Sequence, residues 1–368
     1  MLLTTLCALL SLSVPPDTLP KPVSVLPLPI VYYTPETRLA YGAAAAVTFR
    51  FRRDLAAIRA DRIRPGATLP RPSQVTLGFA YTQNRQVLVY LPFQIFYDRD
   101  RYYLNGEAGY YRYTYFFFGT GERDVPREVF GVNFPRIRVN AFRRVAPTLT
   151  VGRLYAGLRY QYEDYRVTDV EPGGLLASGT VPGGRGSRLS GVGLGLFFDS
   201  RDVVFFPSRG VVADVTYLHQ DEFLGGNVRF DRYAVDVAAY QRLHRRAILA
   251  LNWFVSFTRG TAPFNAMTLL GGTRRMRGYY EGRFRDQNGA VVQGEVRFDL
   301  VGRLGGVLFG AAGILGDERR VLRPGDPKFA GGGGVRFTLN RRDHLNIRLD
   351  YGLGRQSSGL YLTIGEAF

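Results

Sequence analysis

Hydrophobic and polar positions alternate with a period of two along much of the chain. In residues 192–198, 290–300 and 345–351, apolar side chains fall at every second position, mostly with polar residues or glycines between them. Such alternation is typical of β-strands with one apolar face. No helical period separates these segments, so the pattern predicts an all-β protein.

The pattern predicts about sixteen strands, an even number as in bacterial membrane barrels. Without the first of them the count would be odd. They are expected at 27–33, 38–53, 73–83, 86–97, 101–116, 128–142, 148–166, 189–201, 208–219, 228–242, 246–258, 290–301, 304–315, 329–340, 344–353 and 358–368.

The expected connections between strands alternate in length. With both termini on the periplasmic side, the longer connections (167–188, 220–227, 259–289 and 316–328) are extracellular, and the tight turns (98–100, 143–147, 243–245, 302–303 and 341–343) are periplasmic. Membrane barrels show this asymmetry. Residues 54–72 break the rule. They form either a long periplasmic turn or a short amphipathic helix at the membrane surface, and the pattern leaves both open.

Composition agrees with a barrel that crosses a membrane. The chain has 368 residues, of which 46% are hydrophobic, yet its mean hydropathy is −0.09. No apolar run reaches 18 residues, which excludes a helical membrane protein beyond the N-terminus. The 44 glycines, 23 tyrosines and 26 phenylalanines suit curved strands and aromatic girdles. On composition alone, a secreted or cytosolic β-sandwich or propeller stays possible.

The chain is strongly basic, with a formal net charge of +17. Nearly all of this charge is arginine, because Lys21 and Lys328 are the only lysines. A basic chain suggests nucleic acid as a partner. These arginines are instead spread along the sequence and alternate with apolar residues, so a lumen lined with arginine and basic periplasmic turns explain them. We expect no nucleic-acid binding.

The N-terminus predicts export. Residues 1–13 form a short apolar signal peptide, with Ser11 and Ser13 at positions that suit cleavage. Residues 14–26 are then a short periplasmic segment, and 27–368 the barrel. The one cysteine, Cys7, lies in the signal, so no disulfide or cysteine metal site is expected. We expect no cofactor.

One polar segment stands out between two alternating regions. Residues 271–280 read GGTRRMRGYY, and about five strand-like segments follow before the chain stops at Phe368. In this context the motif resembles the BamA/TamA family of outer-membrane barrels, the bacterial surface antigen superfamily. The resemblance implies that the loop at 259–289 folds into the lumen. Its tip would be Arg277, Gly278 and Tyr279, and Arg277 would pair with Glu295 on the next strand.

Three further places carry the resemblance. Phe309 to Gly313 resembles a family motif with an aspartate where this chain has Ala311, so Glu295 is expected to hold the loop alone. The 199–210 segment resembles a family turn, marked by Asp199, Arg201, Pro207 and Gly210. The C-terminal residues look like a terminal strand signal, with Leu360, Leu362, Ile364 and Phe368 on one face and Glu366 as an interruption.

Plainer explanations exist for these residues. Arg277 could be a solvated loop arginine, and Glu295 an unrelated carboxylate of the lumen. The 199–210 segment could be a polar hairpin in which proline and glycine only shape the turn.

The resemblance implies a transmembrane antiparallel barrel in the outer membrane of a Gram-negative cell. Such barrels insert or translocate proteins, so lipid, client outer-membrane proteins and a separate periplasmic partner are the expected partners of a monomeric barrel. Residues 14–26 are too short for a polypeptide-transport-associated module, which predicts a barrel-only member. The alternative is a passive pore or structural barrel plugged by the arginine loop.

Catalysis is a distant third hypothesis. The three histidines are His219, His244 and His344, and a hydrolase site would need a serine, a histidine and an acid on one face. His219 with Asp221 and Glu222 is the best candidate set. We expect that the protein is not an enzyme.

Overall fold

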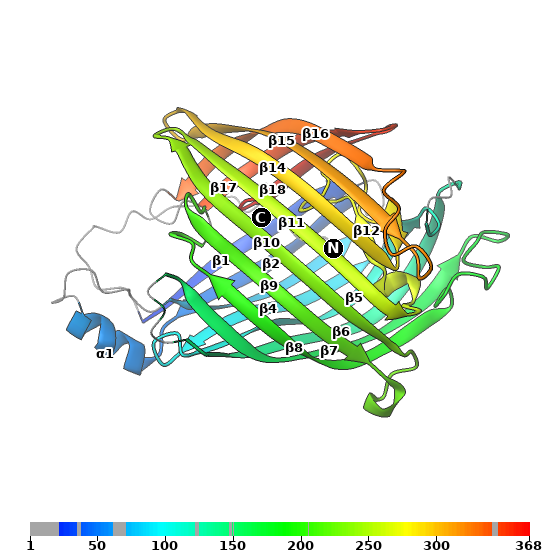
Figure 1. Ribbon diagram of the computed structural model, residues 1–368, viewed down its shortest axis with the longest axis horizontal. Helices are drawn as coiled ribbons and strands as arrows, with labels where there is room; N and C mark the ends of the chain where they lie inside the picture. The colour runs from blue at the N-terminus through cyan, green and yellow to red at the C-terminus, as the bar shows by residue number, and fades with distance from the viewer. Residues whose placement is uncertain are drawn as a thin grey trace.

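The computed structural model shows one large antiparallel sheet of sixteen strands, which curls into a barrel (Figure 1). It describes residues 22–34, 38–61, 71–121, 125–146, 149, 151–204, 206–340 and 345–368. Each strand pairs with its neighbours in chain order. The predicted all-β barrel of about sixteen strands is confirmed. The predicted signal peptide lies outside the described residues.

The strands of the main sheet are 8 to 18 residues long. They are β1 (Val23–Thr34), β2 (Arg38–Phe49), β3 (Ser73–Thr82), β4 (Val87–Tyr97), β5 (Tyr102–Phe117), β6 (Glu128–Arg144), β7 (Arg153–Val170), β8 (Gly186–Asp199), β9 (Gly210–Gln220), β10 (Phe230–His244), β11 (Ala247–Gly260), β14 (Asn288–Val301), β15 (Leu304–Gly316), β16 (Lys328–Asn340), β17 (Leu345–Gly354) and β18 (Ser357–Ile364).

The alternation along the strands sorts side chains into two faces. On β14, Val292 and Val296 are exposed on the outer face, whereas Gln293, Glu295 and Arg297 are buried on the inner face. The 192–198 and 345–351 segments divide in the same way. The outer face is therefore apolar, as a lipid-facing surface must be, and the inner face is polar.

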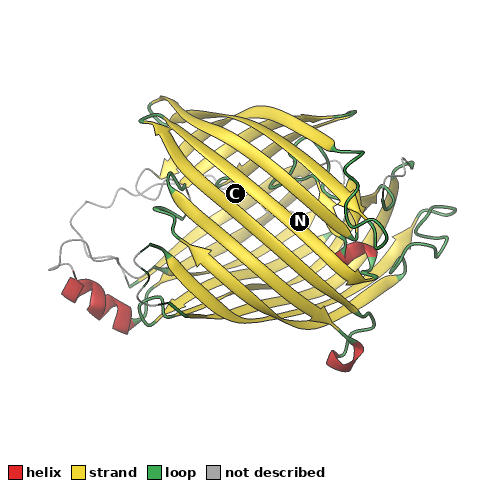
Figure 2. Cartoon of the chain, in the orientation of Figure 1, coloured by secondary structure: helices red, strands yellow, loops and turns green. Residues whose placement is uncertain are grey.

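The two ends of the barrel differ, as Figure 2 shows. Connections 171–185, 221–229, 261–287 and 317–327 lie at one end, called here the loop end. Most connections at the opposite turn end are short, such as 245–246 and 302–303. The predicted asymmetry is thus present. A small 3-10 helix, η1 (Glu222–Leu224), lies in the loop between β9 and β10.

The long connection at the turn end contains a short helix, α1 (Arg52–Asp61). Its position at the membrane surface stays a prediction. Asp54 is 2% exposed and accepts a hydrogen bond of 2.8 Å from the backbone N–H of Arg99. This contact fastens α1 to the turn between β4 and β5. Five of its ten residues are charged. Residues 62–70 lie outside the described part of the chain.

The first and last strands form a seam. Within the described residues, no register pairs β1 with β18. β1 begins at Val23, inside the segment expected to precede the barrel. No helix among the described residues is long and apolar enough to cross a membrane.

Candidate functional site: the arginine loop inside the barrel

The connection between β11 and β14 is a folded loop that enters the lumen. It contains the 3-10 helix η2 (Phe264–Ala266) and a two-stranded sheet that the pattern did not predict, formed by β12 (Thr268–Leu270) and β13 (Phe284–Asp286). Between these strands lies the tip, residues 271–283. Pairing of β12 with β13 holds the loop as a narrow hairpin, which places its arginine motif deep in the barrel.

Arg277 is the centre of the tip and is 2% exposed. Its Nη2 lies 2.5 Å from Glu295 Oε2 on β14, and its Nη1 lies 2.6 Å from Asp350 Oδ2 on β17. The guanidinium also stacks on the ring of Phe309, 3.7 Å from its centroid. A planar guanidinium can fork between two carboxylates, which fixes its orientation as well as its charge. Arg277 therefore ties the loop to two separate strands.

The sequence-predicted pair of Arg277 and Glu295 is thus in contact, but Glu295 does not act alone. The expectation that one carboxylate holds the loop is wrong. Asp350 supplies the second carboxylate from β17, whereas Ala311 on β15 packs near a small apolar cluster of the loop. Asp350 stands on the polar side of the alternating 345–351 segment, which was its only sequence signal.

The ion pairs continue around Arg277 as a buried network. Arg297 donates through Nε to Glu295 at 2.6 Å, and Arg336 contacts both Asp350 and Glu366. Together with Arg348, the network has four guanidinium groups and three carboxylates, all 4% exposed or less at their side chains. Removing one partner from such a buried pair typically costs about 3–5 kcal/mol.

Glycines let the loop backbone touch the barrel wall. Gly278 has φ +124°, and a Cβ there would lie 2.6 Å from the backbone carbon of Leu353. Gly352 is its counterpart on β17, because a Cβ at that position would lie 2.6 Å from the nitrogen of Gly278. A side chain at either position therefore forces the two backbones apart.

Tyrosines complete the contact of the tip with the wall. The backbone N–H of Gly278 donates to the hydroxyl of Tyr361 at 2.9 Å, and this hydroxyl donates to the carbonyl of Tyr279 at 3.0 Å. Tyr279 is fully buried, and its own hydroxyl donates to the carbonyl of Phe329 at 2.8 Å. The loop tip is thus bonded to β16 and β18 as well.

Arg275 binds the tip to another part of the wall. Its Nη2 lies 2.5 Å from Asp236 Oδ2 on β10, and its guanidinium is 3.5 Å from the ring centroid of Phe254 on β11. Asn252 donates to the same carboxylate at 2.6 Å, and Gln293 bonds both Asn252 and the carbonyl of Arg274. Polar contacts therefore run from β10 to β18 along the loop.

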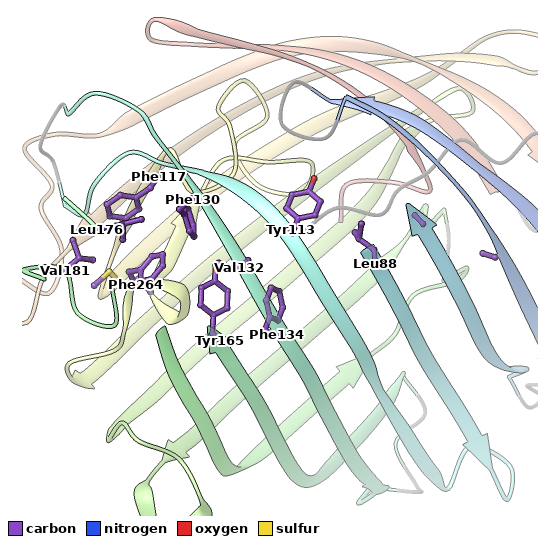
Figure 3. Close-up of a cluster of buried hydrophobic side chains, with 13 residues drawn as sticks. Leu88, Tyr113, Phe117, Phe130, Val132, Phe134, Tyr165, Leu176, Val181 and Phe264 are labelled. Atoms are coloured by element: carbon purple, nitrogen blue, oxygen red, sulfur yellow. The ribbon is translucent and has the colours of Figure 1, made fainter. Parts of the chain in front are cut away.

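At the loop end the same loop packs on the opposite wall (Figure 3). Phe264, fully buried, contacts the rings of Phe117, Phe130 and Tyr165 on β5, β6 and β7. Beside it, Asn265 donates to Glu163 at 3.0 Å. The loop thus spans the lumen between β5–β7 and β14–β18, which makes it a plug in geometric terms.

The turn between β8 and β9 contains the other predicted motif. Asp199 is fully buried and accepts hydrogen bonds from the backbone and side chain of Arg201 and from Arg71. Pro207 is buried. Gly210 has φ +103°, and a Cβ there would lie 2.3 Å from the carbonyl oxygen of Ser200. The four residues shape one turn at the turn end.

Asp202 holds the same turn closed. It accepts hydrogen bonds from the backbone N–H and the hydroxyl of Ser208, at 2.9 and 2.5 Å. Although partial burial raises the pKa of Asp202, these bonds and those from Arg209 and Val203 hold it below its ordinary value of 3.8.

The C-terminal residues differ from expectation. Leu360 and Leu362 face outward on β18, but Phe368 does not share their face, and the side chain of Ile364 lies outside the described residues. Gly365, with φ +82°, ends the strand. Phe368 then packs near Tyr240 and Ala250 of the inner face. The physical reason is Glu366, which binds Arg336 at 2.9 Å and draws the tail inward.

His219 lies on β9 between two acids. Its Nδ1 is 2.7 Å from Asp231 and its Nε2 is 3.3 Å from Asp221, while Glu222 is exposed in η1. The absence of enzymatic activity stays a prediction.

The fold and the site define a class of protein: a transmembrane β-barrel whose lumen is crossed by a loop fixed through a buried arginine. A model of the Omp85 superfamily domain matches residues 69–368. The chain therefore belongs to the Omp85 superfamily, and the resemblance drawn from its sequence is confirmed. A search of the curated proteins finds no match.

Solved structures agree on the fold. BamA from Haemophilus ducreyi lacking POTRA domains 1–3 matches with a TM-score of 0.56 at 12% identity, over 94% of this chain and 69% of that one. CdiB from Escherichia coli matches with a TM-score of 0.64 at 11% identity, over 95% and 62%. CdiB from Acinetobacter baumannii matches with a TM-score of 0.59 at 14% identity, over 94% of this chain and 60% of that one. The chain spans less than two thirds of either CdiB.

Proposed function

We propose that this protein is an outer-membrane barrel of a Gram-negative cell that inserts or translocates proteins, or acts on lipid, with a separate periplasmic partner. Membership of the Omp85 superfamily and the likeness of its fold to the BamA and CdiB barrels support this function. Its partners would be client outer-membrane proteins and membrane lipid. The barrel would work as a monomer, without cofactor or catalysis.

The observation that carries the proposal is the forked contact of Arg277 with Glu295 and Asp350. This contact keeps the loop across the lumen, so a client would have to use another route. The seam between β1 and β18 offers one. β1 contains Pro27 and Pro29, which cannot donate hydrogen bonds to a neighbouring strand, so pairing at this edge is weak.

A passive pore or structural barrel plugged by its loop is the second candidate. The observation that favours it is the charged inner wall: Arg136, Glu163, Arg159 and Asp214 project into the lumen from β6, β7 and β9. Such a surface suits the passage of ions and water once the loop moves.

Single-channel conductance in planar bilayers tests the role of the loop. Wild type is expected to be nearly closed. Arg277→Ala is expected to open, because it loses both ion pairs, and Glu295→Ala to open less, because Asp350 still binds Arg277. Arg166→Ala is a matched control, since the Arg166 side chain is 68% exposed. A steady open wild-type pore that neither variant changes would contradict the plug.

Insertion of a client separates the two candidates. Liposomes that contain the purified barrel are supplied with an unfolded outer-membrane protein, and its folding is followed by protease resistance. An assembly barrel accelerates folding over empty liposomes. Equal rates with and without the barrel favour the passive pore.

A further inference from the structure

An arginine of the inner wall lacks, among the described residues, the ion pair that several other lumen arginines have. Arg136, Arg138, Arg159 and Arg275 each contact a carboxylate. Arg232 on β10 has no such partner among the described residues. Its hydrogen bond goes to the hydroxyl of Thr258 at 3.3 Å. Arginine keeps its proton in proteins, so this charge stays on the inner wall.

The charged neighbour of Arg232 has the same sign. The positive charge of Arg138 on β6 repels that of Arg232. Arg138 itself is poorly neutralised, because it lies 3.5 Å from Glu107 and 3.9 Å from Glu163. Arg136 holds Glu163 more tightly, at 2.6 Å. Two guanidinium groups therefore share an excess of positive charge, which is costly in a partly desolvated place unless an anion balances it.

Uncharged hydrogen-bonding groups surround Arg232 on the same face. Its register partners are Leu218 on β9 and Thr258 on β11, so Gln220 and Ser256 are its diagonal neighbours. Such neighbours lie about 7–8 Å apart, a span that one polyatomic anion can bridge with side chains reaching from both sides. The site is thus built from three adjacent strands.

The side chains of two of these residues have no hydrogen-bond partner within the described protein. Gln220 is fully buried, and neither atom of its amide has a hydrogen-bond partner there. The hydroxyl of Ser256, 2% exposed, also lacks one, as does the Nε of Arg232. Buried polar groups are normally satisfied, so a cluster of unused donors beside an unpaired arginine indicates a ligand.

We propose that the inner wall of β9–β11 holds an anion site, centred on Arg232, that takes a phosphate-bearing group. A guanidinium presents forked donors that match two phosphate oxygens. The Gln220 amide and the Ser256 hydroxyl donate to the remaining oxygens, and Arg138 adds charge from β6. The group is either free phosphate or the phosphate of a lipid headgroup. The site stands independently of the insertion function.

Isothermal titration of the purified full chain in zwitterionic detergent micelles tests the site. The probes are inorganic phosphate and short-chain phosphatidic acid, with short-chain phosphatidylcholine as the zwitterionic lipid control. Saturable binding of either anionic probe to wild type is expected. Binding of phosphatidic acid alone identifies a lipid as the source, and binding of inorganic phosphate identifies the free anion.

Variants assign the binding to Arg232. Arg232→Gln is expected to weaken it by about tenfold or more, because hydrogen bonds to a charged group are lost. Arg166→Gln removes the same charge from an exposed position and is expected to bind as wild type. Heat-modified mobility on gels shows that each variant is folded. No binding to wild type, or equal binding by Arg232→Gln and wild type, would overturn the proposal.

Discussion

Arg277 shows at the scale of one residue how a weak motif becomes a structural centre. An arginine followed by glycine and tyrosine occurs by chance in many chains. Here Glu295 and Asp350 bind both sides of its guanidinium, and Phe309 covers its face. The pairing with Glu295 could be predicted from the next strand. Asp350 could not, because it lies 73 residues away and only the curvature of the barrel brings it near.

Glycine at the loop tip gives a second test at this scale. Gly278→Ala and Gly352→Ala are each expected to push the loop off β17, because the added carbon would lie 2.6 Å from backbone atoms. Both variants should show raised conductance in planar bilayers. Gly325→Ala, where a Cβ would meet nothing within 4 Å, should match wild type. Closed channels in both test variants would contradict the close contact.

At the scale of elements, most strands could be predicted because their periodicity is local. The alternation on β14 and β17 placed Glu295, Arg297, Arg348 and Asp350 on the inner face correctly. The error at the C-terminus has a different origin. Residues two apart share a face only while the strand continues, and Gly365 ends β18 before Phe368. The small sheet of β12 and β13 was missed because three-residue strands are too short to show a period.

The β8–β9 turn yields a prediction for pH. Because the pKa of Asp202 is lowered in the folded protein, its contribution to stability is present above the unfolded value of about 3.8. It is lost as pH falls through the lower folded value. Asp202→Asn should therefore lower the melting temperature at pH 7.

The difference between wild type and Asp202→Asn should shrink as the pH falls below about 3.8. Asp299→Asn, an exposed carboxylate at the end of β14, is the matched control. Circular dichroism melts at several pH values check this. A difference that is constant from pH 7 to pH 3 would argue against the Asp202 contacts.

At the scale of the whole molecule, the loop is held at two distant places. Phe264 packs in an aromatic cluster near the loop end, and Arg277 is bound deeper in the lumen. These anchors use different forces, apolar burial and ion pairing. Either one alone therefore keeps part of the loop across the barrel.

This arrangement predicts distinct effects for the two anchors. Phe264→Ala should cost about 3–5 kcal/mol of stability through the cavity it leaves, with little change in conductance, because the tip stays bound. The double variant with Arg277→Ala should open more than Arg277→Ala alone. Denaturant unfolding and bilayer conductance measure the two quantities. A fully open Phe264→Ala channel would show that the tip contacts do not hold the loop by themselves.

The sequence by itself determined the strands, their two faces, the asymmetry of the connections and the loop that carries Arg277. These features are local, since a period of two and a turn are written in adjacent residues. Only the tertiary structure decided that Asp350, Arg336 and Glu366 join Arg277 in one network, and that no described carboxylate pairs with Arg232. The reason is physical: partners across a barrel are set by register and curvature, which bring together residues that no local pattern connects.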